Sequence, residues 1–527
     1  MIRKRLLPLL VPASFFLWVS PLAYSQQNPV PDALSPASFN TAYKPPLFTD
    51  SATRFQKITA AFPAVEKIYH DYAIKNHFPG LAFGIVVDGK LVYTGTVGYT
   101  DLSSQTPVHA GSLFRIASMT KSFTAMAILK LRDEGRLNLD DPAWLYIPEI
   151  KKMPYLTADA PLITIRNLMS HSAGFPEDNP WGDRQLADTE EELIQLIEKG
   201  VSFSNVPGIN YEYSNLGFAM LGKIITQVSG KPYQQYITEN ILAPLGMKHT
   251  IWEYTRAPEG LLAHGYRWLN DKWNEEPLLH DGSYGAMGGL ITSVEDFSLY
   301  MAYHLAAWPP RNEAGKGPVK RSSLREMHQP RTFSNQNLSY RYPDGRACPL
   351  VSFYSYGLRW TKDCEGRTFL GHSGGLPGFG SQWQILPEYG IGVVALANLT
   401  YAGLNTPNWA ALDTLIRLAG LHPRQLPASD ILTQRKDQLL AILPDWKEAD
   451  KAGIFAVNFF KDYPLDTLKK TTRDLYAKAG RIKKITALIP ENQLRGSFEI
   501  EGEQATIHVF FTLTPENPSL IQQLDLK

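Results

Sequence analysis

Cysteine is nearly absent from this chain: only Cys348 and Cys364 occur in 527 residues. Two thiols are too few for a disulfide framework. They could pair with each other in an oxidising compartment, since Tyr356–Trp360 and Arg367–Leu370 look like two arms of a hairpin near them; two unpaired thiols are the alternative. No cluster of histidine or cysteine has the spacing of zinc ligands, so we expect no metal and no cofactor.

The chain also lacks an excess of charge of either sign. Lysine and arginine number 52, aspartate and glutamate 51, and the net charge is +1. This balance gives no support for binding to nucleic acid or to an anionic membrane surface. A composition of 44% hydrophobic and 20% charged residues is typical of a soluble globular protein, and the length predicts two or three domains.

A long hydrophobic run stands only at the N-terminus. A basic stretch, Met1–Arg5, precedes apolar residues from Leu6 to about Leu22, and Ala23-Tyr-Ser25 supplies small residues where signal peptidase reads them. Residues 1–25 are therefore predicted to be a signal peptide, which leaves the mature protein periplasmic or secreted, without a stable membrane anchor. A retained transmembrane anchor is the alternative, because the run approaches a membrane span in length, but its prolines weaken a long helix.

Residues 26–54 are rich in Pro, Ser, Asn and Ala without apolar periodicity, which predicts a flexible leader. The pattern changes at Phe55. Phe55–Asn76 is predicted to be one amphipathic helix, and Leu81–Val87 and Lys90–Val97 are predicted to be two strands joined by a turn.

Strand patterns return after a stretch, reaching to about Tyr303, that is mostly helices and loops. They cover Thr368–Leu370, Ser381–Leu386 and Ile391–Leu396. Strands at both ends with helices between them predict a domain over residues 55–422 of the α+β class, an α/β sandwich. Its antiparallel sheet is assembled from both ends of the domain around a helical insertion.

A separate small α+β domain is predicted over residues 428–527. The expected helices and strands are Asp430–Leu443 and Pro464–Ala479, then Ile482–Ile489, Leu494–Ile500 and Ala505–Leu513. The arrangement loosely resembles a cystatin-like or nuclear transport factor 2-like domain. Covering a cleft of the main domain and mediating association both stay open as roles for it.

Ser118-Met-Thr-Lys121 is the only Ser-x-x-Lys in the chain, and it lies at the start of a predicted buried helix, Ser118–Glu134. Residues three apart share a face of a helix, so the Lys121 amine can reach Ser118. A serine hydroxyl is a poor nucleophile at neutral pH and needs such a proton acceptor beside it. About two such tetrapeptides are expected by chance in a chain of this length, so the motif gains weight only from its companions.

Two further segments accompany it. Tyr211-Glu-Tyr213-Ser-Asn215 lies on a turn that enters the predicted helix Phe218–Gln227, and Gly371-His372-Ser-Gly374-Gly375 directly follows a predicted strand. A tyrosine in such a turn is often structural, at the cap of the next helix. His280-Asp-Gly282 also fits a His-x-Gly pattern, but it sits in a loop, and His372 is preferred.

The order Ser-x-x-Lys, Tyr-x-Asn, then basic residue-x-Gly resembles the penicillin-recognising serine hydrolases. That superfamily holds class C β-lactamases, D,D-peptidases, D-aminopeptidases and β-lactamase-fold esterases, and it implies a β-lactamase/transpeptidase-like fold. The likeness spans roughly Ala60 to Ala419. Flanking segments extend it: Ser112-Leu-Phe-Arg-Ile-Ala, Ile163-Thr-Ile-Arg-Asn-Leu-Met-Ser-His171-Ser-Ala-Gly174, Pro244-Leu-Gly-Met-Lys-His-Thr250, Gly288-Gly-Leu-Ile-Thr-Ser293 and Gly378-Phe-Gly380.

The resemblance implies acyl transfer. Ser118 attacks a carbonyl carbon and forms an acyl-enzyme that water resolves, and Lys121 lowers the cost of deprotonating it. Tyr213 accepts the serine proton and passes it to the leaving group, for which its pKa must fall from about 10 under nearby positive charge. Asn215 hydrogen-bonds the lysine and the amide of the substrate.

The resemblance of the third motif, His372-Ser-Gly374, implies the oxyanion hole and the substrate-binding residues. The oxyanion hole is expected from the backbone N–H groups of Ser118 and Gly375, with His372 and Ser373 binding substrate. A glycine at position 374 lets the substrate lie close against the strand. His171 is expected to be a structural hydrogen-bonding residue below the site. A Ser-His-Asp triad is the alternative mechanism, but no Gly-x-Ser-x-Gly elbow surrounds Ser118.

His372 departs from the pattern of class C β-lactamases, which carry lysine there. A histidine is only partly charged near pH 7 and is a weaker partner for a β-lactam carboxylate. We therefore expect an exported serine hydrolase acting on a peptide amide or ester, of D,D-peptidase, D-aminopeptidase or esterase type, with a small molecule or peptide as its partner. A β-lactamase and a non-catalytic, penicillin-binding-like sensor or binding protein are the alternatives.

Overall fold

A computed structural model describes residues 43–49 and 51–527 of the protein. The predicted signal peptide and most of the predicted leader lie outside these residues. Within the described part of the chain, no helix has the length and apolarity to cross a membrane.

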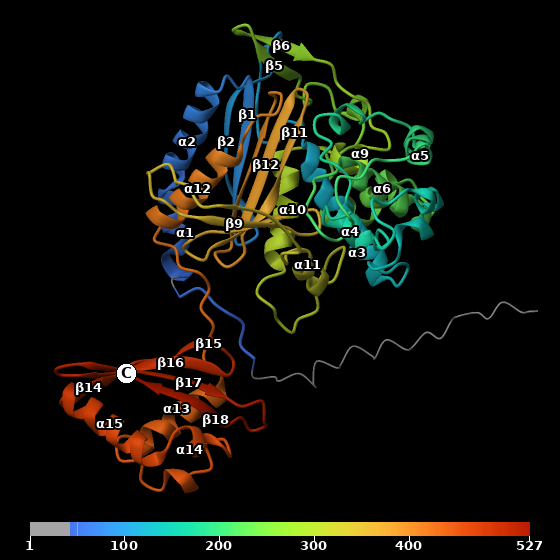
Figure 1. Ribbon diagram of the computed structural model, residues 1–527. Helices are drawn as coiled ribbons and strands as arrows, with labels where there is room; N and C mark the ends of the chain where they lie inside the picture. Colours follow the sequence, from blue (N-terminus) through green and yellow to red (C-terminus); the bar gives the residue numbers. More distant parts are fainter. Residues whose placement is uncertain (1–42, 50) are drawn as a thin grey trace, which may run out of the picture. The chain divides into compact units, whose positions relative to one another are not determined.

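A nine-stranded antiparallel sheet forms the centre of the main domain (Figure 1). The strand that begins the domain pairs with one near its end, with Leu81 opposite Ala397 and Val87 opposite Ile391. This pairing confirms the predicted α+β fold with a sheet built from both ends. In sheet order the strands are β3 (Thr106–Pro107), β2 (Lys90–Asp101), β1 (Gly80–Val87), β13 (Ile391–Ala397), β12 (Phe379–Leu386), β11 (Thr368–Leu376), β10 (Arg359–Lys362), β9 (Leu350–Tyr354) and β8 (Thr332–Asn337).

The central strands are buried on both faces, which explains their nearly continuous apolar sequences. Phe83 and Ile85 of β1 pack into one core, and Ala82 and Val86 pack into the other, as the period of two requires. One face is covered by α1 (Ser51–Ala60), α2 (Phe62–Lys75) and α12 (Asn405–Leu418), and the other by α10 (Val294–Ala306) and the helical insertion (Figure 1).

The helical insertion carries the segments that meet the sheet at the candidate site. Its helices are α3 (Lys121–Asp133), α4 (Ile165–Met169), α5 (Glu190–Lys199), α6 (Asn215–Ser229), α7 (Tyr233–Ile237), α8 (Ala243–Leu245), α9 (Gly285–Gly288) and, after α10, α11 (Arg321–Met327). Two small strand pairs accompany them: β4 (Phe114–Arg115) with β7 (Ile291–Thr292), and β5 (Gly265–Leu269) with β6 (Lys272–Glu276).

Phe55–Asn76 is not one helix, contrary to the prediction. The chain breaks at Ala61 between α1 and α2, because Pro63 lies in the first turn of α2 and cannot continue a helix from α1. α1 also begins at Ser51, inside the segment predicted to be leader.

The C-terminal residues form a second sheet with its own hydrophobic core. The predicted strand Ile482–Ile489 is two short strands, because residues 486–488 leave the ladder between them. The elements are α13 (Asp430–Ile442), α14 (Phe459–Asp462), α15 (Leu465–Ala479), β14 (Ile482–Ile485), β15 (Ile489–Asn492), β16 (Arg495–Gly502), β17 (Thr506–Leu513) and β18 (Ile521–Leu526).

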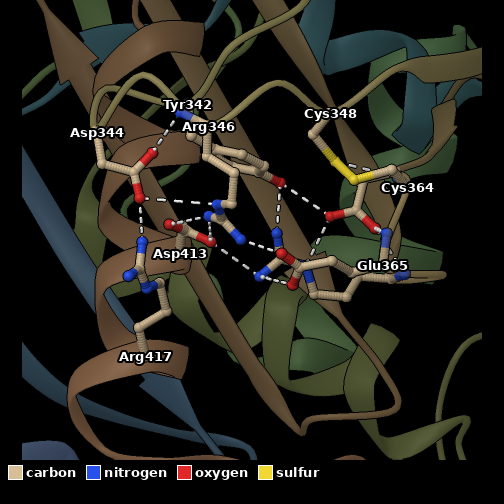
Figure 2. A network of polar contacts seen from close by, with 10 residues as sticks. Tyr342, Asp344, Arg346, Cys348, Cys364, Glu365, Asp413 and Arg417 are labelled. Atoms are coloured by element: carbon tan, nitrogen blue, oxygen red, sulfur yellow. Dashed lines mark hydrogen bonds and ion pairs between the residues drawn. A yellow bond between two sulfur atoms is a disulfide. The ribbon is translucent and has the colours of Figure 1, made fainter.

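A disulfide and a polar network fix the loops beside β9, β10 and α12 (Figure 2). Cys348 and Cys364 form the disulfide. The buried Arg367 guanidinium pairs with Asp363 at 2.6 Å and with Asp413 of α12 at 2.9 Å, and Arg346 reaches Asp413 at 2.8 Å. The β10–β11 turn is therefore tied both to the segment before β9 and to a helix.

Candidate active site

Ser118 lies on a sharp turn between β4 and α3. Ala117 before it has a φ of 47°, a left-handed conformation that is uncommon for a residue with a side chain. A short 3₁₀ segment, Ala117–Thr120, then leads directly into α3. This geometry presents the Ser118 hydroxyl, on a residue that is only 7% exposed, at the junction of the sheet and the helical insertion.

Lys121 lies fully buried one turn further on. Its Nζ donates hydrogen bonds to Ser118 Oγ at 2.9 Å, to Asn215 Oδ1 at 2.7 Å and to the carbonyl oxygen of Met287 at 3.0 Å. The structure thus brings together the lysine of the first motif, its serine and the asparagine of the second motif.

Burial lowers the pKa of Lys121 from its ordinary value near 10.5 to about 7, although the carboxylates of Asp183 and Asp178 oppose the shift. A lysine with this pKa is partly neutral at physiological pH. It can therefore accept a proton, which an ordinary surface lysine cannot do at that pH.

The N-terminus of α6 holds Asn215 in place. Ser214 caps the helix, with its hydroxyl accepting from Gly217 N–H. Asp178 accepts the backbone N–H groups of Asn215 at 2.6 Å and Leu216 at 2.8 Å. The Asn215 amide donates to Asn179 Oδ1 at 2.7 Å, so both ends of this carboxamide have protein partners.

Tyr213 reaches the same site from the other side. Its phenol lies close enough to Ser118 for that hydroxyl to affect its pKa, and Lys121 Nζ lies 4.8 Å from its ring centroid. The expected lowering of its pKa is not found: burial raises the pKa of Tyr213 well above 10, and the Ser118 hydroxyl and the charge of Arg359 only oppose that effect. The phenol therefore keeps its proton near neutral pH.

His372 is buried within β11, which continues through the motif instead of ending before it. Its Nε2 is 2.8 Å from the Tyr354 hydroxyl, and its ring centroid is 6.3 Å from that of Tyr213. Burial, with the charges of Arg359 and Lys121, lowers the pKa of His372 well below 6.5, so its imidazole is neutral. It cannot act as a permanent cation.

The other histidines take different places. His171 accepts Ser214 N–H at 3.1 Å and its ring packs 4.3 Å from that of Tyr213, which supports the aromatic wall of the site. His280, the rival for the third motif, is exposed and contacts Glu253 and Tyr254. Among the described hydrogen bonds of the Ser118 hydroxyl, the side-chain partner is Lys121 and not a histidine.

Neighbouring backbone leaves no room for a side chain at Gly374. A Cβ there would lie 2.1 Å from the carbonyl oxygen of Ile116, so the space above this glycine holds the turn before Ser118 and is not free for substrate, contrary to the prediction. Gly375, the predicted oxyanion donor, follows in the same strand opposite Gly380. Ser373 faces the other side of the sheet from His372, and its role in binding substrate stays a prediction.

Sequence reasoning missed several residues around the site. Asp183 is buried with Oδ1 unpartnered, its Oδ2 accepts the Tyr401 hydroxyl at 3.1 Å, and burial raises its pKa. Arg359, an exposed residue at the start of β10, lies with Cζ 5.8 Å from the Tyr213 ring centroid. Asp183 and Asp178 belong to one acidic loop that the sequence displays, but nothing in the sequence ties Arg359 to the site.

This sheet, with Ser118, Lys121, Tyr213 and Asn215 gathered beside β11, defines a member of the penicillin-recognising serine hydrolase superfamily. The family model described as Beta-lactamase matches residues 55–416, and the chain belongs to that family.

Similar proteins agree with this assignment. Protein flp of Staphylococcus aureus (strain MW2) is 31% identical over 381 residues, which cover 70% of this chain and 69% of that protein. Beta-lactamase-like protein 2 of Dictyostelium discoideum is 28% identical over 377 residues, covering 68% and 64%.

Two solved structures share the fold. An octameric penicillin-binding protein homologue from Pyrococcus abyssi has a TM-score of 0.57 and 23% identity, covering 88% of this chain and 98% of its own. A D-stereospecific amidohydrolase from Streptomyces sp. has a TM-score of 0.51 and 24% identity, covering 67% and 97%.

Proposed function

We propose that the protein is a serine hydrolase that forms an acyl-enzyme on Ser118. The observation that carries the proposal is the buried Lys121 amine, 2.9 Å from Ser118 Oγ and with a pKa near 7. In this scheme neutral Lys121 takes the Ser118 proton as Oγ bonds to the carbonyl carbon of the substrate.

The remaining proton transfers follow from the pKa values of Lys121 and Tyr213. Because the phenol of Tyr213 stays protonated, it serves as a donor to the leaving group and is recharged by the ammonium of Lys121 through Ser118 or water. This order reverses the first step expected for Tyr213. The backbone N–H groups of Ser118 and Gly375 are proposed to bind the oxyanion.

A peptide amide or an ester is the proposed substrate class. Neutral His372 is poorly suited to hold a β-lactam carboxylate, which argues against antibiotic hydrolysis as the main activity. The permanent cation next to Tyr213 is instead Arg359, which is placed to attract a carboxylate of a peptide substrate. The Streptomyces structure of the same fold is a D-stereospecific amidohydrolase, so D-amino-acid amides belong in the first substrate set.

We also propose that the enzyme is exported, with residues 1–25 removed, and that residues 428–527 form an accessory domain. The disulfide between Cys348 and Cys364 supports an oxidising compartment. Sequencing the N-terminus of protein recovered from the periplasm or medium tests the cleavage. A mature chain that still begins at Met1 would reject it.

The catalytic proposal is tested by intact-mass measurement after exposure to a fluorophosphonate. We expect one adduct, mapped to Ser118, that is absent in Ser118→Ala and forms far more slowly in Lys121→Ala. Turnover is then screened with D-amino-acid anilides, D-Ala-D-Ala peptides, p-nitrophenyl esters and a chromogenic cephalosporin. Folded protein with an unmodified Ser118 would instead support a non-catalytic binding role, and rapid cephalosporin turnover would support a β-lactamase.

A further inference from the structure

A cavity of about 350 Å³ lies on the face of the sheet that packs against α12. Its floor is formed by β11 and β12 at Ser373, Gln382 and Gln384, and its sides by residues of β8, β9, β10 and α12. Ser118, Lys121, Tyr213, Asn215 and His372 are not among its lining residues. Its size is within the range of small-molecule pockets, which hold roughly 300–1,000 Å³.

Two buried carboxamides on the floor lack partners. Gln382 is 3% exposed and Gln384 is 6% exposed, and Oε1 of each is buried without a hydrogen bond. Burying an amide oxygen without a partner costs free energy, and buried polar groups in native proteins are normally satisfied. Both side chains line the cavity, so a polar molecule bound there can form hydrogen bonds with their carboxamides once the oxygens turn toward it.

The rest of the lining restricts that molecule. Hydroxyls and carboxamides dominate it, including Ser352, Thr361 and Asn405, and groups of these types both donate and accept hydrogen bonds. Among the described residues that line the cavity there is no carboxylate, and the one cation is Arg359. Such a lining suits neither a cationic ligand nor a polyanion, but it matches the alternating donors and acceptors of neutral hydroxyl groups.

The cavity is built before any ligand enters. Trp409 on α12 stacks on Phe369 of β11 with ring centroids 4.0 Å apart, and its Nε1 donates to Asn405 Oδ1 at 2.9 Å, which fixes the orientation of that carboxamide. The ring centroids of Tyr340 and Trp409 are 5.6 Å apart. Tyr340 precedes Cys348 in the chain, and the disulfide ties Cys348 to the β10–β11 turn. A rigid wall reduces the entropy lost on binding.

We propose that this cavity binds a neutral saccharide, a mono- or disaccharide whose hydroxyls reach Gln382 and Gln384. Arg359 and Ser373 of the Ser118 site also line this cavity, but none of the side chains proposed to form the acyl-enzyme or to transfer protons does, so the cavity is separate from that chemistry. Binding to Ser118→Ala should therefore match binding to the wild type, and loss of hydrolysis leaves the test of this cavity intact.

The experiment is isothermal titration calorimetry of the full-length protein with glucose, N-acetylglucosamine and their disaccharides. We expect at least one to bind, and the double variant Gln382→Met and Gln384→Met to lose tenfold or more in affinity. The double variant should fold, because neither Oε1 that it removes has a protein partner. Gln336→Met on β8, an exposed residue outside the lining, is the matched control and should bind as the wild type does.

Asn405→Ala provides a second variant at an exposed lining position, with the same expected loss, if the double variant is unstable. Fluorophosphonate labelling of Ser118 should be unchanged in both variants. Absence of saccharide binding by the wild type overturns the proposal. Binding that both sets of variants retain also overturns it, because the sugar then lies elsewhere.

Discussion

Lys121 Nζ donates a 2.9 Å hydrogen bond to Ser118 Oγ from a position that solvent does not reach. The same burial that shields the amine lowers its pKa, so one packing feature both places the proposed proton acceptor and tunes it. Asn215 and the Met287 carbonyl fix the direction of the amine.

The pH dependence of Ser118 acylation follows from this pair. Lys121 accepts a proton only when it is neutral, so the acylation rate should rise as pH increases through about 7 and fall below it. Replacing Lys121 with Met should lower the rate by roughly 10²–10⁴-fold and remove this dependence. The rate of fluorophosphonate labelling between pH 5 and 9 measures both.

Lys130→Met is the matched control for this prediction. Lys130 lies on the same helix, α3, and forms an ion pair with Glu134 away from Ser118. Loss of the Lys130 amine should leave the rate of Ser118 labelling and its dependence on pH unchanged. A profile of Lys121→Met that still rises through pH 7 would assign the proton acceptor to another group.

The ion pairs around Asp413 should stabilise the main domain (Figure 2). Asp413 accepts from Arg367 at 2.9 Å and from Arg346 at 2.8 Å, and Asp413→Ala leaves the buried Arg367 without one of its carboxylates. Breaking a buried pair costs about 3 kcal/mol in the free energy of unfolding. Arg417→Ala, which removes an exposed partner of Asp344 one turn along α12, should cost less than about 1 kcal/mol.

Urea unfolding of the two variants measures this difference. Equal losses for Asp413→Ala and Arg417→Ala would show that the network contributes no more than a surface ion pair.

Two buried histidines predict acid sensitivity. Trp308 Nε1–H donates to His328 Nδ1 at 2.8 Å, and His328 Nε2 lies 2.7 Å from His304 Nδ1, so neither ring can gain a proton without losing a hydrogen bond. Burial lowers the pKa of His328 to about 3, and it lowers the pKa of His304 well below 6.5. Both shifts are depressions, so the unfolded chain binds more protons below pH 6.5.

The free energy of unfolding should therefore fall as pH decreases from about 6.5 toward 4, by up to about 1.4 kcal/mol per pH unit for each histidine. His328→Gln should reduce that slope by about one proton, as read from urea titrations at several pH values. The exposed His422 provides the control, since His422→Gln should leave the slope as it is. An unchanged slope in His328→Gln would mean that other groups cause the acid sensitivity.

The predictable parts of the fold were those with strong local patterns. β1, β12 and β13 agree with the predicted strands to within two residues, because burial on both faces gives them continuous apolar sequences. β8, Thr-Phe-Ser-Asn-Gln-Asn, has no such pattern and forms because β9 offers it an edge. Neither its polar sequence nor its turn signals indicated a strand.

At the candidate site too, contacts set by local spacing could be predicted, and contacts set by the packed fold could not. Spacing on a helix was enough to place Lys121 beside Ser118. It did not predict Arg359 near Tyr213, which depends on how β10 meets a turn more than 140 positions earlier in the chain. Nor did it predict the direction of the Tyr213 pKa, because burial competes with charge and only the packed structure decides the balance.

The contact between Gly374 and the turn before Ser118 yields the last prediction. A Cβ at position 374 would meet the Ile116 carbonyl oxygen at 2.1 Å and the Ser381 hydroxyl, which itself donates to that carbonyl at 2.7 Å. A backbone carbonyl cannot rotate away as a side chain can, so Gly374→Ala must push the turn from β11. A misplacement of about 1 Å in a catalytic group can cost roughly 10²-fold in rate. Gly403→Ala, where the Cβ meets only the Tyr72 hydroxyl at 3.8 Å, is the control that should label at the rate of the wild type. Rapid fluorophosphonate labelling of a folded Gly374→Ala variant would show that the position of Ser118 does not depend on this contact.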